Sequence, residues 1–267
     1  MLENYDQFLQ AIKNGDALAI AYAVVVGLIL ILGIVALVIK GILAIRYWKA
    51  NRTPISTNMS GADAARYVLD KNGLSHVNVR SAGFIREFFF GNYYNILTKT
   101  IYLRSFLFKI DTKKSVTSTA IAVQKAGLAK LCEDGDKQAR VRNSLSLIGV
   151  FGPILFIPVL LIGVVLDFIV LKSPKPYISA ICLAVSGFFA VAGFIVTMLN
   201  IPVEKKANEL ALEMIRNSGL ATEEEMVVMK KIFDTFIVSY ICDFILELLR
   251  VVEWILEILI KARDSKN

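Results

Sequence analysis

Histidine is almost missing from this chain of 267 residues, which contains only one, His76. Sites that need two or more histidine ligands are therefore excluded. A lone histidine before an expected strand is more often a surface or packing residue than a ligand. The sequence also has no C-x-x-C pair, no G-x-x-x-x-G-K-[ST] phosphate loop and no G-x-G-x-x-G. It carries no complete motif for common metal or nucleotide chemistry.

Cysteine is scarce as well. The three cysteines, Cys132, Cys182 and Cys242, are odd in number and scattered, so we expect no disulfide framework. Charged residues make up only 20% of the chain and hydrophobic residues 56%, which is too apolar for an ordinary soluble domain of this length. The net charge of +7 does not indicate a nucleic-acid partner, because Lys and Arg at the cytoplasmic flanks of membrane segments raise it.

Three long apolar runs are present, and each can cross a bilayer, which takes about 20 residues. Ala17–Ile39, Asn143–Leu166 and Pro176–Val203 contain no charged side chain. Basic residues gather after the first run, before the second and after the third. By the positive-inside rule, the N-terminus lies outside and both larger polar regions lie in the cytoplasm. We therefore expect a multi-pass protein of the cell (inner) membrane.

The predicted fold class is a mostly α membrane protein with three to four transmembrane helices and a small cytoplasmic α+β domain. The expected parts are an extracytoplasmic N-terminus (1–16), a first span (17–45), the cytoplasmic domain (46–142), a second span (143–171), a short external loop (172–176), a third span (177–203), a cytoplasmic helical segment (204–231) and a C-terminal helix (232–261).

Two helices are predicted in the cytoplasmic domain. The first lies in SGADAARYVLDKNGL, where Ser60 and Asp63 form a capping-box pattern and Asn72-Gly73 provides a left-handed stop. The second runs from about Val116 to Leu131. Helix caps and apolar spacing carry the first prediction, and the small residues of STAIAVQKAGLAKL carry the second.

Between these helices, HVNVRSAG and NILTKTIYLR alternate and are rich in β-branched and aromatic residues, which predicts a pair of strands. The aromatic segment FIREFFFGNYYN joins them. We interpret it as a hairpin tip or a membrane-surface loop, with ligand binding as the weaker alternative. The domain is then helix, strand pair, helix.

The C-terminal run is apolar around most of a helix but carries one charged strip, made of Asp243, Glu247, Arg250, Glu257 and Lys261. In a spanning helix these side chains must face protein or water. In a helix lying in the headgroup plane they would face solvent. Both interpretations stay open, and the first four residues are candidate contacts with a partner.

The order of these parts resembles the membrane-bound neutral zinc metallopeptidases of the zinc peptidase-2 family. The matching segments are SGADAARYVLDKNGL, LTKTIYL, PVE after the third span, and GLATEEE. The resemblance extends from the first span to the last and implies a metallopeptidase-like fold for the cytoplasmic domain.

The resemblance also implies A-H-E-V-G-H-A in the helix after LTKTIYL, but the same register here reads VQKAGLA. Gln124 and Leu128 stand at the two histidine positions and Lys125 at the general base. In such a motif the histidines bind zinc and the glutamate takes a proton from metal-bound water. An amide is a poor ligand, an isobutyl group is none, and an ammonium repels a dication. We predict a degenerate site with no metal, no cofactor and no catalysis.

Glu204, in PVE, matches the position from which the family is expected to draw a further ligand or a neighbouring group. The alternative is an ordinary charge where the third span meets the cytosol. We hypothesise that a buried Glu204 is balanced by Lys125 or Lys206, so that an ammonium replaces the charge of zinc. A serine–lysine dyad between Ser115 or Ser118 and Lys125 is a weaker alternative.

These observations favour a catalytically inactive homologue that acts as a membrane scaffold or adaptor. Its expected partners are the lipid bilayer and a membrane protein or a second copy of itself, and not nucleic acid. One alternative is an active peptidase with an unrecognised site. The other is a structural subunit of a larger membrane complex unrelated to proteolysis.

Overall fold

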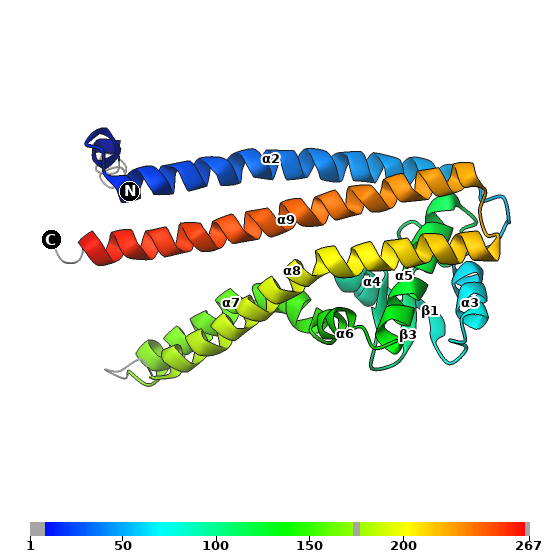
Figure 1. Ribbon diagram of the computed structural model, residues 1–267. Coiled ribbons are helices and arrows are strands. Elements are labelled where there is room, and N and C mark those ends of the chain that lie inside the picture. Colours follow the sequence, from blue (N-terminus) through cyan, green and yellow to red (C-terminus); the bar gives the residue numbers. More distant parts are fainter. Residues whose placement is uncertain (1–8, 173–176, 265–267) are drawn as a thin grey trace. The chain divides into compact units, whose positions relative to one another are not determined.

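The computed structural model describes residues 9–172 and 177–264, and within them the chain is mostly helical with one small sheet (Figure 1). The elements are α2 (Ala17–Arg52), α3 (Gly61–Lys71), β1 (Asn78–Ala82), α4 (Phe84–Phe90), β2 (Tyr93–Asn95), β3 (Thr100–Arg104), α5 (Val116–Glu133), α6 (Lys137–Ser144), α7 (Ser146–Val164), the π-helix η1 (Val165–Val170), α8 (Tyr177–Ser218) and α9 (Glu223–Asp264).

The chain divides into two compact units. One combines Met1–Ile42 with Val238–Asn267, and the other is Leu43–Ile237. In the first unit, Lys40 Nζ lies 2.8 Å from Asp243 Oδ1, and Arg263 pairs with Asp16. The second unit holds the sheet, the helices from α3 to α8 and the adjoining ends of α2 and α9.

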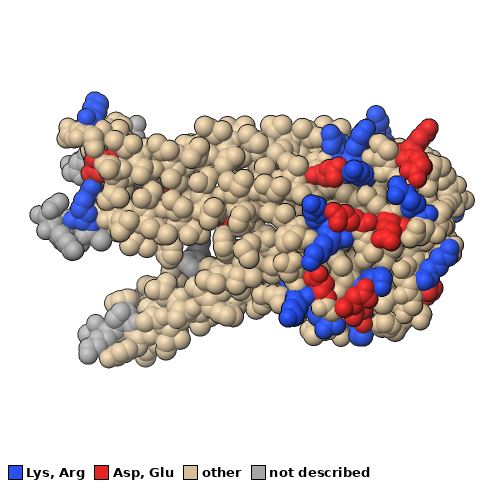
Figure 2. Space-filling model, in the orientation of Figure 1, with Lys and Arg blue, Asp and Glu red and all other residues tan. Residues whose placement is uncertain are grey.

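Two helices are long and apolar enough to cross a membrane, namely α2 with 36 residues and α8 with 42. They account for two of the three to four expected spans within the described residues. The segments at 143–171 and 232–261 stay predictions. Figure 2 shows few charged side chains over α2, α9, α7 and the first part of α8, and many over the part that holds the sheet.

Helix α8 continues through Pro202 without a break and enters the core of the second unit. In its polar half, five residues are buried in this core: Val203, Ala207, Ala211, Met214 and Ile215. One helix therefore links a candidate membrane span directly to the packing of the α+β region.

The two predicted helices of this region are confirmed. In α3, Ser60 Oγ accepts a hydrogen bond from the Asp63 backbone N–H at 3.2 Å, and Gly73 follows with a φ of +73°. Helix α5 begins at the predicted residue and ends at Glu133, two residues later than expected.

The two predicted strands are confirmed as β1 and β3, which pair with each other, but the interpretation of the segment between them as a hairpin tip is wrong. The sheet has the order β1-β3-β2, and β1 lies parallel to β3, with Asn78 opposite Thr100. Parallel neighbours need a crossover, and the aromatic segment supplies it as α4 followed by β2. The buried Glu87 carboxylate of α4 accepts hydrogen bonds from the backbone N–H groups of residues 105–107, which fixes the helix beside the end of β3.

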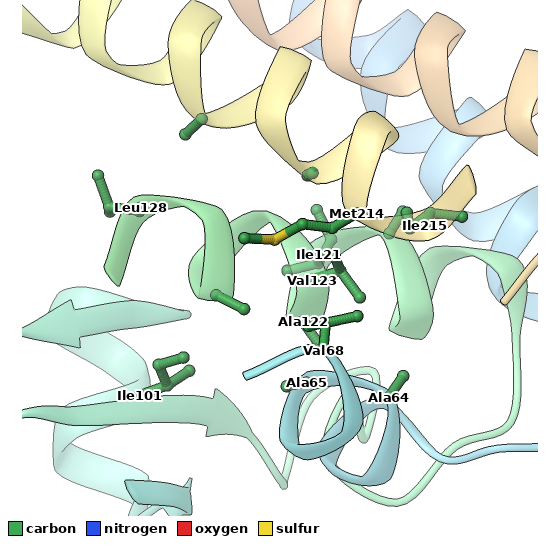
Figure 3. Packing of buried hydrophobic residues seen from close by; sticks show 14 of the residues in the cluster. Ala64, Ala65, Val68, Ile101, Ile121, Ala122, Val123, Leu128, Met214 and Ile215 are labelled. Carbon is green, nitrogen blue, oxygen red and sulfur yellow. The ribbon is translucent and has the colours of Figure 1, made fainter. Parts of the chain in front are cut away.

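Helix α5 lies at the centre of the core, and most of its side chains are buried. On one side it packs against α3 and on another against α8 (Figure 3). The labelled contacts come from Ala64, Ala65 and Val68 of α3, from Ile121, Ala122 and Val123 of α5, and from Met214 and Ile215 of α8. Small residues along α5 allow neighbours to approach it from several sides.

Candidate functional site

The candidate site forms where α5 and α8 approach most closely. A Cβ atom added to Gly127 would lie 2.9 Å from the carbonyl oxygen of Ala207, so this position admits only glycine without a shift. The close approach places the turn of α5 that holds Gln124 and Lys125 against the turn of α8 that holds Glu204.

Glu204 is only 2% exposed and receives contacts from three side chains. Gln124 Nε2 donates a hydrogen bond to Oε2. Arg142 Nη2 lies 2.5 Å from Oε1 and Lys125 Nζ lies 3.7 Å from the same atom. Arg142 Nε also donates to Asn200 Oδ1 at 2.9 Å, which orients the guanidinium from a second point of α8. We call Gln124, Lys125, Arg142 and Glu204 the Glu204 network.

The charges of this network balance one another only in part. Burial lowers the pKa of Lys125, and the Glu204 carboxylate opposes that shift. Burial alone would raise the pKa of Glu204, which follows the apolar part of α8, but the positive charges of Lys125 and Arg142 hold it below its usual value. An ionised carboxylate thus faces the amine of buried Lys125 and the guanidinium of half-buried Arg142, and removing it would leave both without their acidic partner.

The expected pairing of Glu204 with Lys125 is present, but the pairing with Lys206 is not. Lys206 Nζ instead lies 2.7 Å from Asp136 Oδ2 and 3.2 Å from Gln138 Oε1. Arg142 was considered in the sequence only as a basic flank of the second span. No local pattern connects it with Glu204, since the two residues lie 62 positions apart.

The remaining residues considered for the site lie elsewhere. Leu128 is fully buried in the hydrophobic core. His76 Nε2 lies 3.2 Å from Glu133 Oε2, and Lys99 Nζ contacts the same oxygen at 2.9 Å. Ser115 and Ser118 hydrogen-bond each other at the start of α5, where Ser115 is the N-cap residue.

The side chains of the Glu204 network do not fit a zinc ion. Zinc in proteins takes three or four lone pairs from Cys, His, Asp or Glu. Here the Gln124 amide turns an N–H group toward the carboxylate, and the two remaining members are cations. Within the described residues, no three His, Cys, Asp or Glu side chains come together as a possible metal site.

The charged strip of the C-terminal run lies on α9. Asp243 pairs with Lys40 of α2. Glu247 and Glu257 are half-buried and Arg250 is exposed, whereas the side chain of Lys261 lies outside the described residues. Along the described part of the strip, exposure thus ranges from half-buried to exposed.

The family model described as "Putative neutral zinc metallopeptidase" matches residues 23–259, from the first part of α2 nearly to the end of α9. No curated protein and no solved structure matches this chain. The matched range contains α5, the polar half of α8 and every residue of the Glu204 network. Because this range covers most of the sequence, the chain belongs to the neutral zinc metallopeptidase family of zinc peptidase-2 proteins.

Proposed function

We propose that this protein is a catalytically inactive member of its family that serves as a membrane scaffold or adaptor. The observation that carries the proposal is the Glu204 network, in which the carboxylate is held by an amide, an ammonium and a guanidinium. In an active H-E-x-x-H peptidase, the positions of Gln124, Lys125 and Leu128 would supply two zinc ligands and a general base.

Electrostatics argues against a dication at this position. Two unit charges 4 Å apart interact by about 4 kcal/mol at an effective dielectric constant near 20. A dication beside Glu204 would gain about twice that from the carboxylate and lose a similar amount to a charged Lys125. Arg142 adds to that repulsion, because its guanidinium contacts the same carboxylate oxygen. The network is consistent with a structural role for Glu204 and not with metal-dependent peptide hydrolysis.

We also propose that the protein crosses the inner membrane three to four times, with its α+β region in the cytoplasm. Supporting this are α2 and α8, which have the length and composition of spans. Exposed Phe84, Ile85 and Phe88 of α4 also suit contact with a membrane surface.

We place the partner contact on the charged strip of α9. A charged side chain at bilayer depth must face protein or water, which makes such a residue a candidate for function. Arg250 is exposed and Glu247 is half-buried on this helix. A membrane protein, or a second copy of this chain, could complement both charges with polar groups of its own.

Zinc analysis of the full-length protein tests the inactivity. We expect the chain purified in mild detergent and dialysed against buffered zinc to retain well below one zinc per chain, and to show no chelator-sensitive cleavage of casein. Near-stoichiometric tightly bound zinc, lost in a Gln124→Ala/Glu204→Gln variant, would overturn the proposal. Zinc that this variant retains would be bound elsewhere in the molecule.

Co-purification tests the adaptor role. We expect a defined membrane protein, or a second copy of the chain, to remain associated in mild detergent and to dissociate in a Glu247→Gln/Arg250→Gln variant. A Glu209→Gln/Lys137→Gln variant changes the same kinds of charge on exposed positions of the other unit and should retain it. Equal retention by both variants would remove the strip from the proposal.

The second candidate function is an active peptidase, which the family description favours. It requires hydrolysis through groups outside the Glu204 network. Activity that survives chelation and the Gln124→Ala/Glu204→Gln substitutions would support it.

A further inference from the structure

A small open cavity of about 230 Å³ lies in the second unit, where the end of α2 meets the start of α9. Its lining consists of Arg46, Lys49, Ala50, Thr53, Val228, Lys231 and Ile232. Three of these seven residues are cations and none is acidic. An anion is therefore the ligand class that this lining favours.

The cavity has an apolar floor and a basic rim. Ala50 and Ile232 are buried, whereas Arg46, Lys49 and Lys231 are exposed. A ligand that suits both parts has an anionic group attached to hydrocarbon. A phospholipid headgroup whose phosphate carries further carbon atoms on its outer side, as in phosphatidylglycerol, has this composition.

Arg46 is held in position at the rim. Its Nη1 atom donates to the Lys231 backbone carbonyl at 3.3 Å and to Thr235 Oγ1 at 2.5 Å. These bonds connect α2 to α9 and restrict the guanidinium before any ligand arrives. A restricted cation loses less conformational freedom on binding than an unrestrained one.

The position of the cavity along α2 corresponds to a membrane surface. The hydrocarbon layer is about 30 Å thick, and Ala17–Ile39 can fill it. Arg46 lies about 10 Å beyond Ile39 at 1.5 Å per residue, within reach of headgroups for a long side chain. Trp48 is 51% exposed beside it, and tryptophan is enriched at this depth.

We propose that this cavity binds the phosphate of an anionic phospholipid. Arg46, Lys49 and Lys231 contact the phosphate oxygens, and Ala50, Val228 and Ile232 contact the carbon atoms of the headgroup on the outer side of the phosphate. The proposal rests on the membrane insertion of α2 described above, but not on catalytic inactivity. Basic pockets between membrane helices on the cytoplasmic side are known to bind acidic headgroups in this way.

Native mass spectrometry of the full chain in detergent tests the site, with dioleoyl phosphatidylglycerol and dioleoyl phosphatidylcholine as probes. We expect selective binding of phosphatidylglycerol. A Lys49→Gln/Lys231→Gln variant should weaken it about 30-fold, from about 1 kcal/mol for each basic side chain. A Lys49→Arg/Lys231→Arg variant should retain binding, which separates loss of charge from loss of fold.

The matched control is Lys71→Gln/Lys114→Gln, which removes two exposed lysines outside the cavity lining and should bind phosphatidylglycerol as the unmodified chain does. Equal affinity for both lipids, or equal weakening in the control, would overturn the proposal. Displacement of phosphatidylglycerol by millimolar inorganic phosphate would also overturn it, since the cavity would then be a free-phosphate site. The zinc measurement is unaffected by these variants, so the two proposals can fail separately.

Discussion

At Glu204, a carboxylate that is almost fully buried divides its two oxygen atoms among three donors. Buried ion pairs contribute little net stability when they are intact, because desolvation offsets the attraction. Breaking one is costly, since the remaining charge has no solvent and no partner. Substitution of Glu204 therefore measures how much the stability of the fold depends on the complete Glu204 network.

We expect Glu204→Gln to destabilise the protein by about 3 to 5 kcal/mol, because buried Lys125 and half-buried Arg142 would both lose their acidic partner. Urea unfolding in detergent, followed by tryptophan fluorescence, measures the change. Glu209→Gln removes an exposed carboxylate from the same helix and should change stability by less than about 0.5 kcal/mol. Equal effects of the two substitutions would contradict the network.

The same carboxylate predicts a dependence on pH. Its pKa is lower in the folded protein than the ordinary 4.5 because the charges of Lys125 and Arg142 outweigh the effect of burial. Such a group stabilises the fold above its unfolded pKa, and this contribution is lost as the pH falls through the folded value.

We therefore expect the free energy of unfolding to fall below pH 4.5 more steeply in the unmodified protein than in Glu204→Gln. Urea unfolding between pH 7 and pH 3.5 provides the comparison. Parallel curves for the two proteins would show that Glu204 does not titrate in this way.

The members of the Glu204 network could be predicted only in part from the sequence. Lys125 could be placed near Glu204, because the family register aligns both with one site. Arg142 could not, since its partner is distant in the sequence and its charge is also explained by the membrane flank. Lys206 of α8 forms its ion pair with Asp136, and the sequence around Lys206 does not indicate this partner.

At the scale of elements, α5 and α8 can pack closely at Gly127 because glycine has no side chain. A methyl group there would lie 2.9 Å from the Ala207 carbonyl oxygen. Backbone cannot yield as a flexible side chain does, so the two helices would have to separate and disturb the network between them.

We expect Gly127→Ala to destabilise the protein by about 1 to 3 kcal/mol, in spite of the higher helix propensity of alanine. Thermal unfolding by circular dichroism gives the measurement. Gly187→Ala is the matched control, because a Cβ at this α8 glycine meets no atom within 4 Å. Stabilisation by both substitutions would show that α5 and α8 are not in tight contact.

At this scale, individual helices and strands could be predicted from the sequence better than the way they pack and pair. Helix α3 and the start of α5 carry local capping signals, so both were predictable. The FIREFFF segment is apolar on nearly every side and gives no clear period, which concealed α4. Parallel pairing of β1 with β3 is a long-range property that neither strand encodes alone.

Across the whole molecule, the core of the second unit is assembled from segments that precede and follow α7 in the sequence. Residues 43–142 supply α3, the sheet and α5. The polar half of α8, which comes later in the sequence, packs against α5. The hydrogen bond between Arg142 and Asn200 shows that the chain leaves and re-enters this core at neighbouring points.

We expect residues 43–142 alone not to fold cooperatively, because the face of α5 that packs on α8 would be open. Joining 43–144 to 199–237 with a short Gly/Ser linker should restore a cooperative thermal transition without α7 and the apolar part of α8. Circular dichroism and analytical size exclusion compare the two fragments. A cooperative transition in the shorter one would show that α8 is dispensable to the core.

The continuity of α8 also imposes an order on synthesis. About 70 residues separate Arg142 from Ile215, which corresponds to roughly 4 to 14 s at ~5–20 residues per second. During that interval, α5 has already been made while the polar half of α8 that covers it is still being synthesised. The face of α5 that packs on α8 therefore stays uncovered for several seconds, and the nascent chain is prone to aggregation until α8 is complete.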